Sequence, residues 1–158
     1  MGIVFVRIDD RLIHGQVATT WVRNFVVEQI AVISDTLAND PIQTSVVKMA
    51  APVGVNAVLL TKKDFIEAYK KGFKKRTMLI LTNPHDVLSI VEEGVTISSL
   101  NVGGMKFTNG KRKITESVFV TEKDIEAFNR LVGHGIKIAF QMVPSSPKKD
   151  YDQIKNFI

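Results

Sequence analysis

The segment from Arg7 to Gln16, with the sequence RIDDRLIHGQ, holds the side chains of this chain that are best suited to chemistry. It combines two carboxylates, two guanidiniums and one imidazole. Neutral His14 can act as a nucleophile, because imidazole titrates near neutral pH and carries an attacking nitrogen. Arg11 offers a planar fork of donors that matches a phosphate. The combination indicates transfer of a phosphoryl group.

The neighbours of His14 could help to hold and orient the reacting groups. A helix is predicted from Gly15, and its first N–H groups, including that of Gln16, would present the positive end of the helix dipole to the phosphate. Asp9 or Asp10 could orient the imidazole by accepting a hydrogen bond from one ring nitrogen, which would leave the other nitrogen to attack. The sequence does not separate these two carboxylates.

A purely structural role is the alternative for each of these side chains. A histidine near the end of a strand is often structural, and Asp9 and Asp10 could cap the next helix. Arg7 could contact the phosphate or form a salt bridge at the strand end, and we favour the salt bridge. A functional site is favoured because acids, bases and an imidazole gather after the first strand of an alternating chain, where such folds bind ligands.

The remaining candidates lie further along the chain. Asn83 follows the fourth predicted strand, where it is expected to cap a helix and could also face the phosphate. His85 is expected to be a partly exposed helix residue, and His134 lies between two glycines in a surface turn. No two histidines have the spacing of metal ligands on one helix face and cysteine is absent, so no metal site is expected.

Apolar runs that alternate with amphipathic helical patterns must position these side chains. Strands are predicted at residues 3–8, 30–34, 55–60, 78–81, 97–102, 118–120 and 136–142. Helices with their capping residues are predicted at 15–25, 40–52, 61–71, 83–93 and 121–132, and a terminal turn or short helix at 151–158.

This alternation predicts an α/β fold in which a doubly wound, mainly parallel sheet carries helices on both faces. We expect the strand order 3-2-1-4-5, with further edge strands, in a single domain over residues 1–158. In that order the ligand crevice lies between strands one and four, and the loop carrying His14 faces the turn formed by Thr82, Asn83 and Pro84.

Two local expectations can be checked directly against the structure. The helix after Pro41 is expected to turn an apolar set inward, which comprises Ile42, Val46, Val47, Met49 and Ala50. The dipeptide Asn109-Gly110, within the basic stretch from Lys106 to Lys113, is a typical hairpin turn.

The composition limits the classes of function. A chain of 158 residues with 45% apolar and 23% charged residues suits one globular domain. The absence of cysteine excludes disulfides, thiol catalysis and cysteine–zinc sites, and no signal peptide or membrane span is expected. The net charge of +5 permits a nucleotide- or nucleic-acid-binding module, with Asp35 on a ribose, as an alternative. The glycine fingerprint of nucleotide folds is missing, and the basic residues are scattered.

Several motifs, in their order along the chain, resemble one bacterial family. The segment RIDDRLIHGQV resembles the active-site signature of the IIB subunits of the mannose/fructose/sorbose family of sugar phosphotransferase systems (PTS). Further similar motifs are Ser34-Asp35 with Ala38-Asn39-Asp40, Lys48-Met49-Ala50-Ala51-Pro52, Thr82-Asn83-Pro84 and Asn101-Val102-Gly103-Gly104-Met105. The resemblance covers the whole chain.

The resemblance implies a phosphoryl carrier. His14 would accept the group at Nδ1 from the phosphohistidine of a IIA protein or domain, and would pass it to a sugar that enters through the membrane subunits IIC and IID. Asp9 would brace Arg11 against the phosphate, and no metal, nucleotide or other cofactor would be needed.

The resemblance also implies the same strand order, some antiparallel pairing at the far edge of the sheet, and a cytoplasmic protein associated peripherally with the transporter. A regulatory phosphohistidine protein of the same fold remains an alternative. The sugar (mannose, fructose, sorbose, glucose or an amino-hexose such as N-acetylgalactosamine) and a homo-oligomeric state are left open.

Overall fold

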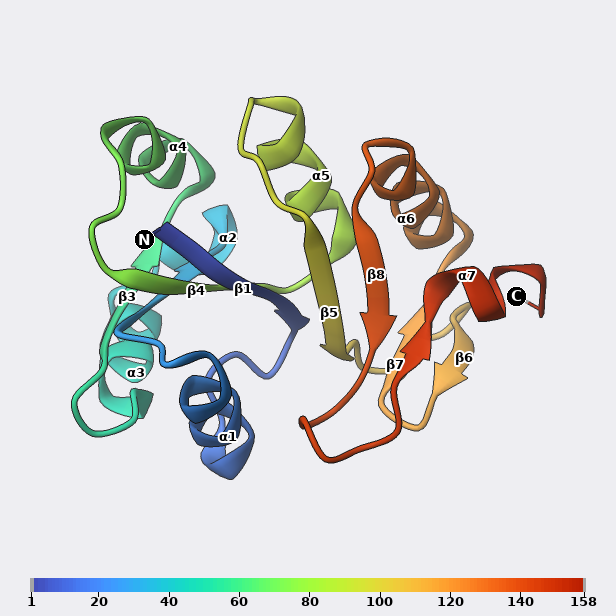
Figure 1. Cartoon of the computed structure of the whole chain (residues 1–158), viewed down its shortest axis with the longest axis horizontal. Helices are drawn as coiled ribbons and strands as arrows, with labels where there is room; N and C mark the ends of the chain where they lie inside the picture. The colour runs from blue at the N-terminus through green and yellow to red at the C-terminus, as the bar shows by residue number, and fades with distance from the viewer. Residues whose placement is uncertain (1, 158) are drawn as a thin grey trace.

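The computed structural model describes residues 2–157 (Figure 1). Its strands are β1 (Gly2–Asp9), β2 (Gln29–Ile33), β3 (Asn56–Leu60), β4 (Arg76–Leu81), β5 (Ser99–Gly104), β6 (Arg112–Thr115), β7 (Val118–Val120), β8 (Lys137–Phe140) and β9 (Lys149–Asp150). Its helices are α1 (Gly15–Phe25), α2 (Asp35–Ala38), α3 (Pro41–Ala50), α4 (Lys62–Lys71), α5 (Pro84–Glu92), α6 (Glu122–Gly133) and α7 (Tyr151–Ile154), followed by the 3-10 turn η1 (Lys155–Phe157). The expected alternation of strands and helices is present.

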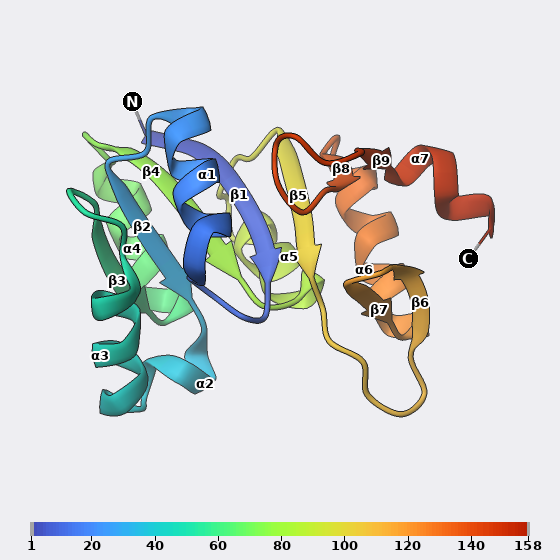
Figure 2. The same ribbon diagram turned by 90° about the horizontal axis from the view of Figure 1, so that it is seen from below.

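The main sheet has seven strands in the order β3-β2-β4-β1-β5-β8-β9, and only the β8–β9 pair is antiparallel. Helices α4, α5 and α6 cover one face of the sheet, and α1 and α3 lie on the other (Figures 1 and 2). The predicted α/β class, with a mainly parallel sheet between helices, is confirmed.

The predicted order 3-2-1-4-5 is wrong in one respect, because β4 lies between β2 and β1. The side chains of Arg7 and Asp9, near the end of β1, fit only beside a strand that has glycine at the facing positions. Strand β5 has Gly103 and Gly104 there. The apolar β4, buried from Thr77 to Leu81, fills the interior position on the other side of β1. Strands β1 and β4 remain neighbours, so their carboxyl ends still lie side by side.

Two apolar cores fix the sheet between its helix layers. Side chains of β1 alternate between the faces, so Val6 and Ile8 join the core under α4, α5 and α6. Phe5 points the other way and stacks on Trp21 of α1, with ring centroids 4.5 Å apart. Arg7 and Asp9 share the face of Phe5, which places two charged groups beside α1.

Local sequence explains where the helices begin. The side chains of Asp40, Thr61, Asn83 and Thr121 each accept a backbone N–H in the first turn of α3, α4, α5 and α6. These N-caps satisfy donors that a helix would otherwise leave unpaired. Helices α4 and α5 start just past the carboxyl ends of β3 and β4, so their caps lie at the edge of the main sheet that carries the His14 loop.

Two local expectations fail. In α3 only Val47 is buried, while Ile42 and Met49 are 71% and 84% exposed. Within residues 2–157 the helix packs mainly on β3 and α2, which leaves Ile42 and Met49 uncovered. Asn109-Gly110 makes a turn closed by the N–H of Lys111 on Thr108 O, but it is not the hairpin turn. The hairpin pairs β6 with β7, because Arg112 and Val120 are register partners whereas residues 106–108 belong to no strand.

No helix in residues 2–157 is both long and apolar enough to span a membrane.

Candidate functional site

Asp9 is the centre of a cluster of cationic and hydrogen-bonding groups at the end of β1. Its side chain is fully buried. It accepts hydrogen bonds from the Nη2 of Arg7 at 3.0 Å, from the Nε and backbone N–H of Arg11, each at 3.1 Å, and from Nε2 of His14 at 3.0 Å. Three residues predicted to form the site are therefore brought together around one carboxylate.

The charge state of Asp9 decides which nitrogen of His14 is free. Burial alone would raise the pKa of Asp9, but hydrogen bonds from Arg11 and His14 and the charge of Arg7 outweigh it, so the pKa lies below its ordinary value. An ionised carboxylate can only accept hydrogen bonds, so Nε2 of His14 must carry the proton. In the neutral imidazole, Nδ1 is then the unprotonated nitrogen.

Arg7 is the buried cation of the cluster. Its side chain is 2% exposed and donates to the side-chain oxygen of Asn101 and, at 3.1 Å, to the carbonyl of Gln141. Its guanidinium lies 5.6 Å from the centre of the Trp21 ring, a cation–π distance. Burial lowers the pKa of Arg7, and the charge of Asp9 opposes that shift. Arg7 thus forms the salt bridge that we favoured, and its burial keeps it from a ligand in solvent.

Glycine is required where β5 passes the cluster. A Cβ on Gly103 would lie 1.8 Å from Nη2 of Arg7, and a Cβ on Gly104 would lie 2.8 Å from Oδ1 of Asp9. Real side chains do not approach so closely. The two glycines therefore make the space in which the buried ion pair sits.

Arg11 is the cation that solvent can reach, with a side chain that is 44% exposed. It donates hydrogen bonds to the carboxylate of Asp9 from Nε at 3.1 Å and from Nη2 at 3.3 Å. The same Nη2 lies 3.4 Å from the sulfur of Met142. His14 is 27% exposed in its side chain. An incoming anion could therefore contact both Arg11 and the imidazole, whereas Arg7 and Asp9 stay behind them.

The backbone between Arg11 and His14 bends sharply. Leu12 has φ 65°, a left-handed conformation that a leucine rarely adopts, and its N–H donates to the carbonyl of Asp9 at 3.0 Å. The bend delivers His14 to the N-cap position of α1, where its side chain makes no cap bond. Gly15 and Gln16 are exposed in the first turn, which contains no acidic residue, and the first N–H groups of a helix have no partner within the helix.

Asp10 does not contact the imidazole. Its Oδ2 accepts the N–H of Lys106 at 2.7 Å, and its own N–H donates to the carbonyl of Gly104 at 3.1 Å. Of the two carboxylates, Asp9 therefore contacts the ring of His14 and Asp10 does not, and an orienting role for Asp9 in catalysis remains a prediction. Asp10 extends away from the loop and ties it to the chain after β5.

Asn83 lies at the end of β4, on the strand adjacent to β1. Its Oδ1 accepts the N–H of Asp86 at 2.9 Å, and its Nδ2 donates to Thr82 and Asp86 at 3.1 and 3.2 Å. The side chain is engaged in the cap of α5, and its contact with a phosphate remains a prediction.

The other two histidines lie outside this cluster. Nε2 of His85 is 2.9 Å from Oδ1 of Asp124, and the imidazole is 49% exposed. His134 is an exposed residue at the end of α6. Residues 2–157 contain no group of three or more histidine and acidic side chains that could hold a metal ion.

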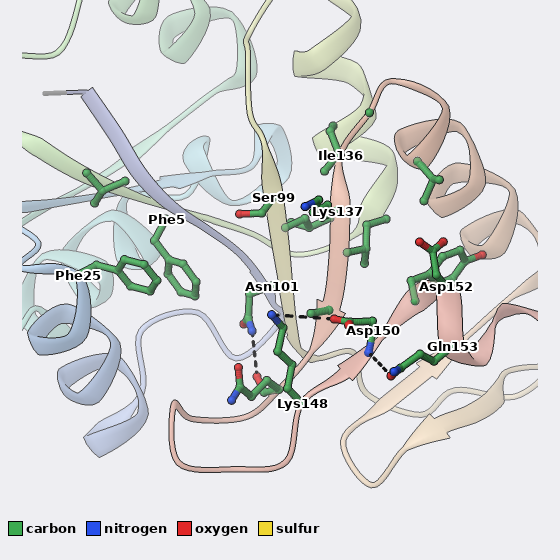
Figure 3. A pocket seen from close by; sticks show the side chains of 18 residues that line it. Phe5, Phe25, Ser99, Asn101, Ile136, Lys137, Lys148, Asp150, Asp152 and Gln153 are labelled. Carbon is green, nitrogen blue, oxygen red and sulfur yellow. Dashed lines mark hydrogen bonds and ion pairs between the residues drawn. The ribbon is translucent and has the colours of Figure 1, made fainter.

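A cavity of about 710 Å³ is lined by residues of β1, β5 and β8 among others, and neither His14 nor Arg11 is among its lining residues (Figure 3). Asn101 lines it, and that same side chain bonds Arg7. The cavity therefore adjoins the back of the ion cluster, while the reactive groups face the edge of the sheet.

Residues that complete the cluster were missed by reasoning from sequence. Asn101 and Gly103 stand out in the sequence only as part of a motif similar to the family's, and Trp21 does not stand out as a site residue. Trp21 is 3% exposed, but its indole N–H also donates to the carbonyl of Met142 at 2.9 Å. A polar Asn101 inside an otherwise apolar buried strand was the available signal. Nothing in the sequence indicates Gln141 or Met142.

Comparisons of the sequence with known proteins identify its family. The family model described as "PTS system sorbose subfamily IIB component" matches residues 3–157. The fructose-specific EIIB component of Bacillus subtilis (strain 168) is 40% identical over 156 residues, which cover 98% of this chain and 96% of the relative. The mannose-specific EIIAB component of Escherichia coli (strain K12) is 45% identical over 150 residues, covering 94% of this chain and 46% of the relative. The chain thus spans about half the length of that EIIAB protein.

Solved structures match along the full length. The crystal structure of the IIBSor domain of the sorbose permease from Klebsiella pneumoniae superposes with a TM-score of 0.94 at 35% identity, covering 100% of this chain and 99% of that one. The family model matches residues 3–157, and a relative that is 40% identical covers 98% of this chain. The chain therefore belongs to the sorbose-subfamily IIB components of the sugar phosphotransferase system.

Proposed function

We propose that this IIB component, acting as one domain over residues 1–158, carries a phosphoryl group on Nδ1 of His14 between a IIA protein and a sugar. In the first transfer, Nδ1 bonds to phosphorus as the P–N bond of the donor phosphohistidine breaks. In the second, the P–N bond on His14 breaks as a sugar hydroxyl oxygen bonds to phosphorus. The activated P–N bond means that neither step needs a nucleotide or metal.

The hydrogen bond from Nε2 of His14 to Asp9 is the observation that carries this proposal. It holds the ring in one tautomer, leaves Nδ1 as the nucleophile, and directs Asp9 to stabilise positive charge on the ring during transfer. Hydrogen bonds from Arg11 and His14 and the charge of Arg7 keep Asp9 ionised, so the carboxylate can continue to accept the hydrogen bond from Nε2.

Arg11 and the start of α1 supply the positive field for the phosphoryl oxygens. Arg11 is an exposed cation, and it pairs with the same carboxylate, that of Asp9, as the imidazole of His14. The N–H groups of Gly15 and Gln16 add donors at the positive end of the α1 dipole. Catalysis would then consist of positioning and charge neutralisation, which are the main contributions to enzymatic phosphoryl transfer.

The partners follow from the family. One relative is an EIIAB protein, in which IIA and IIB are joined, so we propose a IIA protein or domain as the donor. Relatives are named for fructose, mannose, sorbose and N-acetylgalactosamine, so the acceptor is a hexose or amino-hexose. We place the chain in the cytoplasm, docked to the membrane subunits IIC and IID that bring in the sugar.

A two-stage assay tests the function. First, the chain is incubated with a ³²P-phosphorylated IIA protein, and acid-labile phosphate is mapped by mass spectrometry to the peptide containing His14. Second, membrane vesicles with IIC and IID are added with each candidate hexose, and sugar phosphate is measured. Label on His14 followed by sugar phosphate supports the proposal. Label without sugar phosphate indicates a regulatory phosphoprotein instead, and absence of label on His14 refutes both.

A further inference from the structure

A basic segment projects from the edge of the sheet next to the His14 loop. We call residues 105–120, which comprise the loop after β5 and the β6–β7 hairpin, the basic arm. In Figure 2 the loop between β5 and β6 extends beyond the carboxyl end of β5, on the edge where the β1 strand also ends. The arm therefore lies on the side from which a partner must approach His14.

The arm is fixed to the site by several hydrogen bonds. Met105 pairs with the hairpin through its N–H to Ser117 O at 3.0 Å and its carbonyl to Phe119 N at 2.9 Å. The hydroxyl of Ser117 donates to the carbonyl of Gly103 at 2.7 Å. Asp10, four residues before His14, accepts the N–H of Lys106 at 2.7 Å. The arm and the reactive loop are thus held at one fixed separation.

The arm carries an exposed aromatic side chain and four cationic residues. Phe107 is 57% exposed and packs edge-on against Phe119, with centroids 5.5 Å apart. The cations of the arm are Lys106, Lys111, Arg112 and Lys113, against the single carboxylate of Glu116. Arg112 pairs with Glu122 and Lys113 pairs with Glu116. Within residues 2–157, Lys106 and Lys111 take part in no ion pair. Nζ of Lys111 donates to the carbonyl of Lys106 at 3.1 Å, and no carboxylate in that part of the chain balances either charge.

We propose that the basic arm is the docking surface for the phosphoryl donor, with Phe107 as its apolar anchor and Lys106 and Lys111 facing carboxylates of the donor. This inference rests on the proposed function, because it assumes a protein that delivers a phosphoryl group to His14. Exposed aromatic residues such as Phe107 are among those that dominate protein–protein affinity. Complementary charge at the rim accelerates encounter and fixes register.

A protein fits this surface better than a nucleic acid. Two of the four cations are already paired with Glu116 and Glu122, so little charge remains to follow a phosphate backbone. Phe119 packs against Phe107 at an interplanar angle of 78°. Phe107 is therefore better placed to fill a pocket of a protein than to stack between two bases.

Two phosphoryl donors separate docking from chemistry. Phosphoramidate is a small donor whose P–N bond breaks as Nδ1 of His14 bonds to phosphorus and ammonia leaves, so it needs no docking surface. A purified IIA protein, phosphorylated on its histidine, needs one. The variants are Phe107→Ala and the double change Lys106→Glu with Lys111→Glu. Met49→Ala, which removes an even more exposed apolar side chain from α3, is the matched control.

We expect Phe107→Ala to raise KM for the phosphorylated IIA protein about tenfold, the effect of losing one anchoring contact, while kcat changes less than twofold. The charge-reversed double variant should also raise KM and should lose the salt dependence of the wild-type reaction. The phosphoramidate reaction should be unchanged in both variants, and Met49→Ala should match the wild type with both donors.

A wild-type KM for the IIA protein in both arm variants would overturn the inference. So would an effect confined to sugar phosphate formation by vesicles, since the arm would then serve the membrane subunits. If the wild-type chain takes phosphate from neither donor, the proposed function itself fails, and the two failures are distinguishable.

Discussion

The chain contains two histidine–aspartate pairs of nearly the same length, His14–Asp9 at 3.0 Å and His85–Asp124 at 2.9 Å. Both join Nε2 to a buried carboxylate, and both lie where helices start beyond the carboxyl ends of strands. In each, one ring nitrogen is occupied and the other is left over. Hydrogen-bond geometry alone therefore does not distinguish them.

The surroundings of the two carboxylates are very different. Asp9 is contacted by the guanidiniums of Arg7 and Arg11 as well as by the imidazole. Asp124 instead completes a capping box, in which its Oδ2 accepts the N–H of Thr121 at 2.9 Å. Within residues 2–157, no lysine or arginine pairs with Asp124. If the proposed function holds, the comparison teaches that the cations, and not the histidine–aspartate contact, distinguish the phosphoryl site.

The largest expected difference between the pairs is in phosphorylation itself. His14→Asn should abolish labelling by the phosphorylated IIA protein, because Nδ1 is lost as the nucleophile. His85→Asn should leave labelling at the wild-type level, because within residues 2–157 no lysine or arginine pairs with Asp124, the partner of His85, to receive the phosphoryl oxygens. Incorporation of ³²P into each purified variant measures this. Label on His85 in the His14→Asn variant would show that a paired imidazole is sufficient.

The two carboxylates should also differ in their contribution to stability. Asp9→Asn leaves the buried guanidinium of Arg7 without an anion, which should cost about 3–5 kcal/mol of unfolding free energy. Asp124→Asn weakens only a helix cap, at a cost of about 1 kcal/mol. Urea unfolding at pH 7 measures both values. Equal losses would mean that the charges around Asp9 are no more important than an ordinary cap.

The pH dependence of that stability has a defined sign. The folded-state pKa of Asp9 is lowered, so its contribution is fully present above the unfolded value of about 3.9 and is lost as pH falls through the lower folded pKa. Wild-type unfolding free energy should therefore fall steeply below about pH 4, and Asp9→Asn should lack that part of the decline. An identical acid branch in both proteins would contradict the assignment.

Arg11→Gln should affect rate much more than fold. Loss of the exposed guanidinium should slow phosphotransfer about 10²-fold, as removal of one charge-stabilising donor typically does. Unfolding free energy should change by about 1 kcal/mol or less, because Arg11 is half exposed and Arg7 still pairs with Asp9. Arg23→Gln, an exposed arginine on α1, is the matched control and should react normally. A fast Arg11→Gln enzyme would remove Arg11 from the mechanism.

The smallest expected effect concerns the glycines beside each pair. A Cβ on Gly103 would meet Nη2 of Arg7, so Gly103→Ala should cost about 1–3 kcal/mol and displace the ion cluster. Gly133, at the end of the α6 helix that carries Asp124, has no atom within 4 Å of its built Cβ, so Gly133→Ala should be neutral or slightly stabilising. Thermal unfolding compares them, and a neutral Gly103→Ala would show that Arg7 has room to move.

Much of the fold could be predicted because its signals are local. Thr121 and Asp124 form the capping box that their spacing suggests, and α1 spans residues 15–25 as its apolar spacing indicates. The inward set of α3 could not be predicted, because which face of a helix is covered depends on the elements beside it. Met49 is apolar but exposed, since nothing packs over that side of α3.

For the candidate site, the residue types were readable and the pairings were not. Asp9 and Asp10 are adjacent in sequence and chemically identical, yet one contacts His14 and the other contacts Lys106. Successive side chains of a strand point to opposite sides, so the register of β1 against β5 decides between them. Asn101 reaches Arg7 across the same register, from 94 positions away.

The sequence by itself determined that an imidazole, two guanidiniums and two carboxylates would sit at the end of a buried strand, because strand and helix periodicities act over a few neighbouring residues. Only the tertiary structure decided which strand would lie beside β1, which carboxylate would hold His14, and which arginine would be buried. These outcomes depend on contacts between distant segments, such as Gly103 against Arg7, where the absence of a single Cβ makes room for a buried charge.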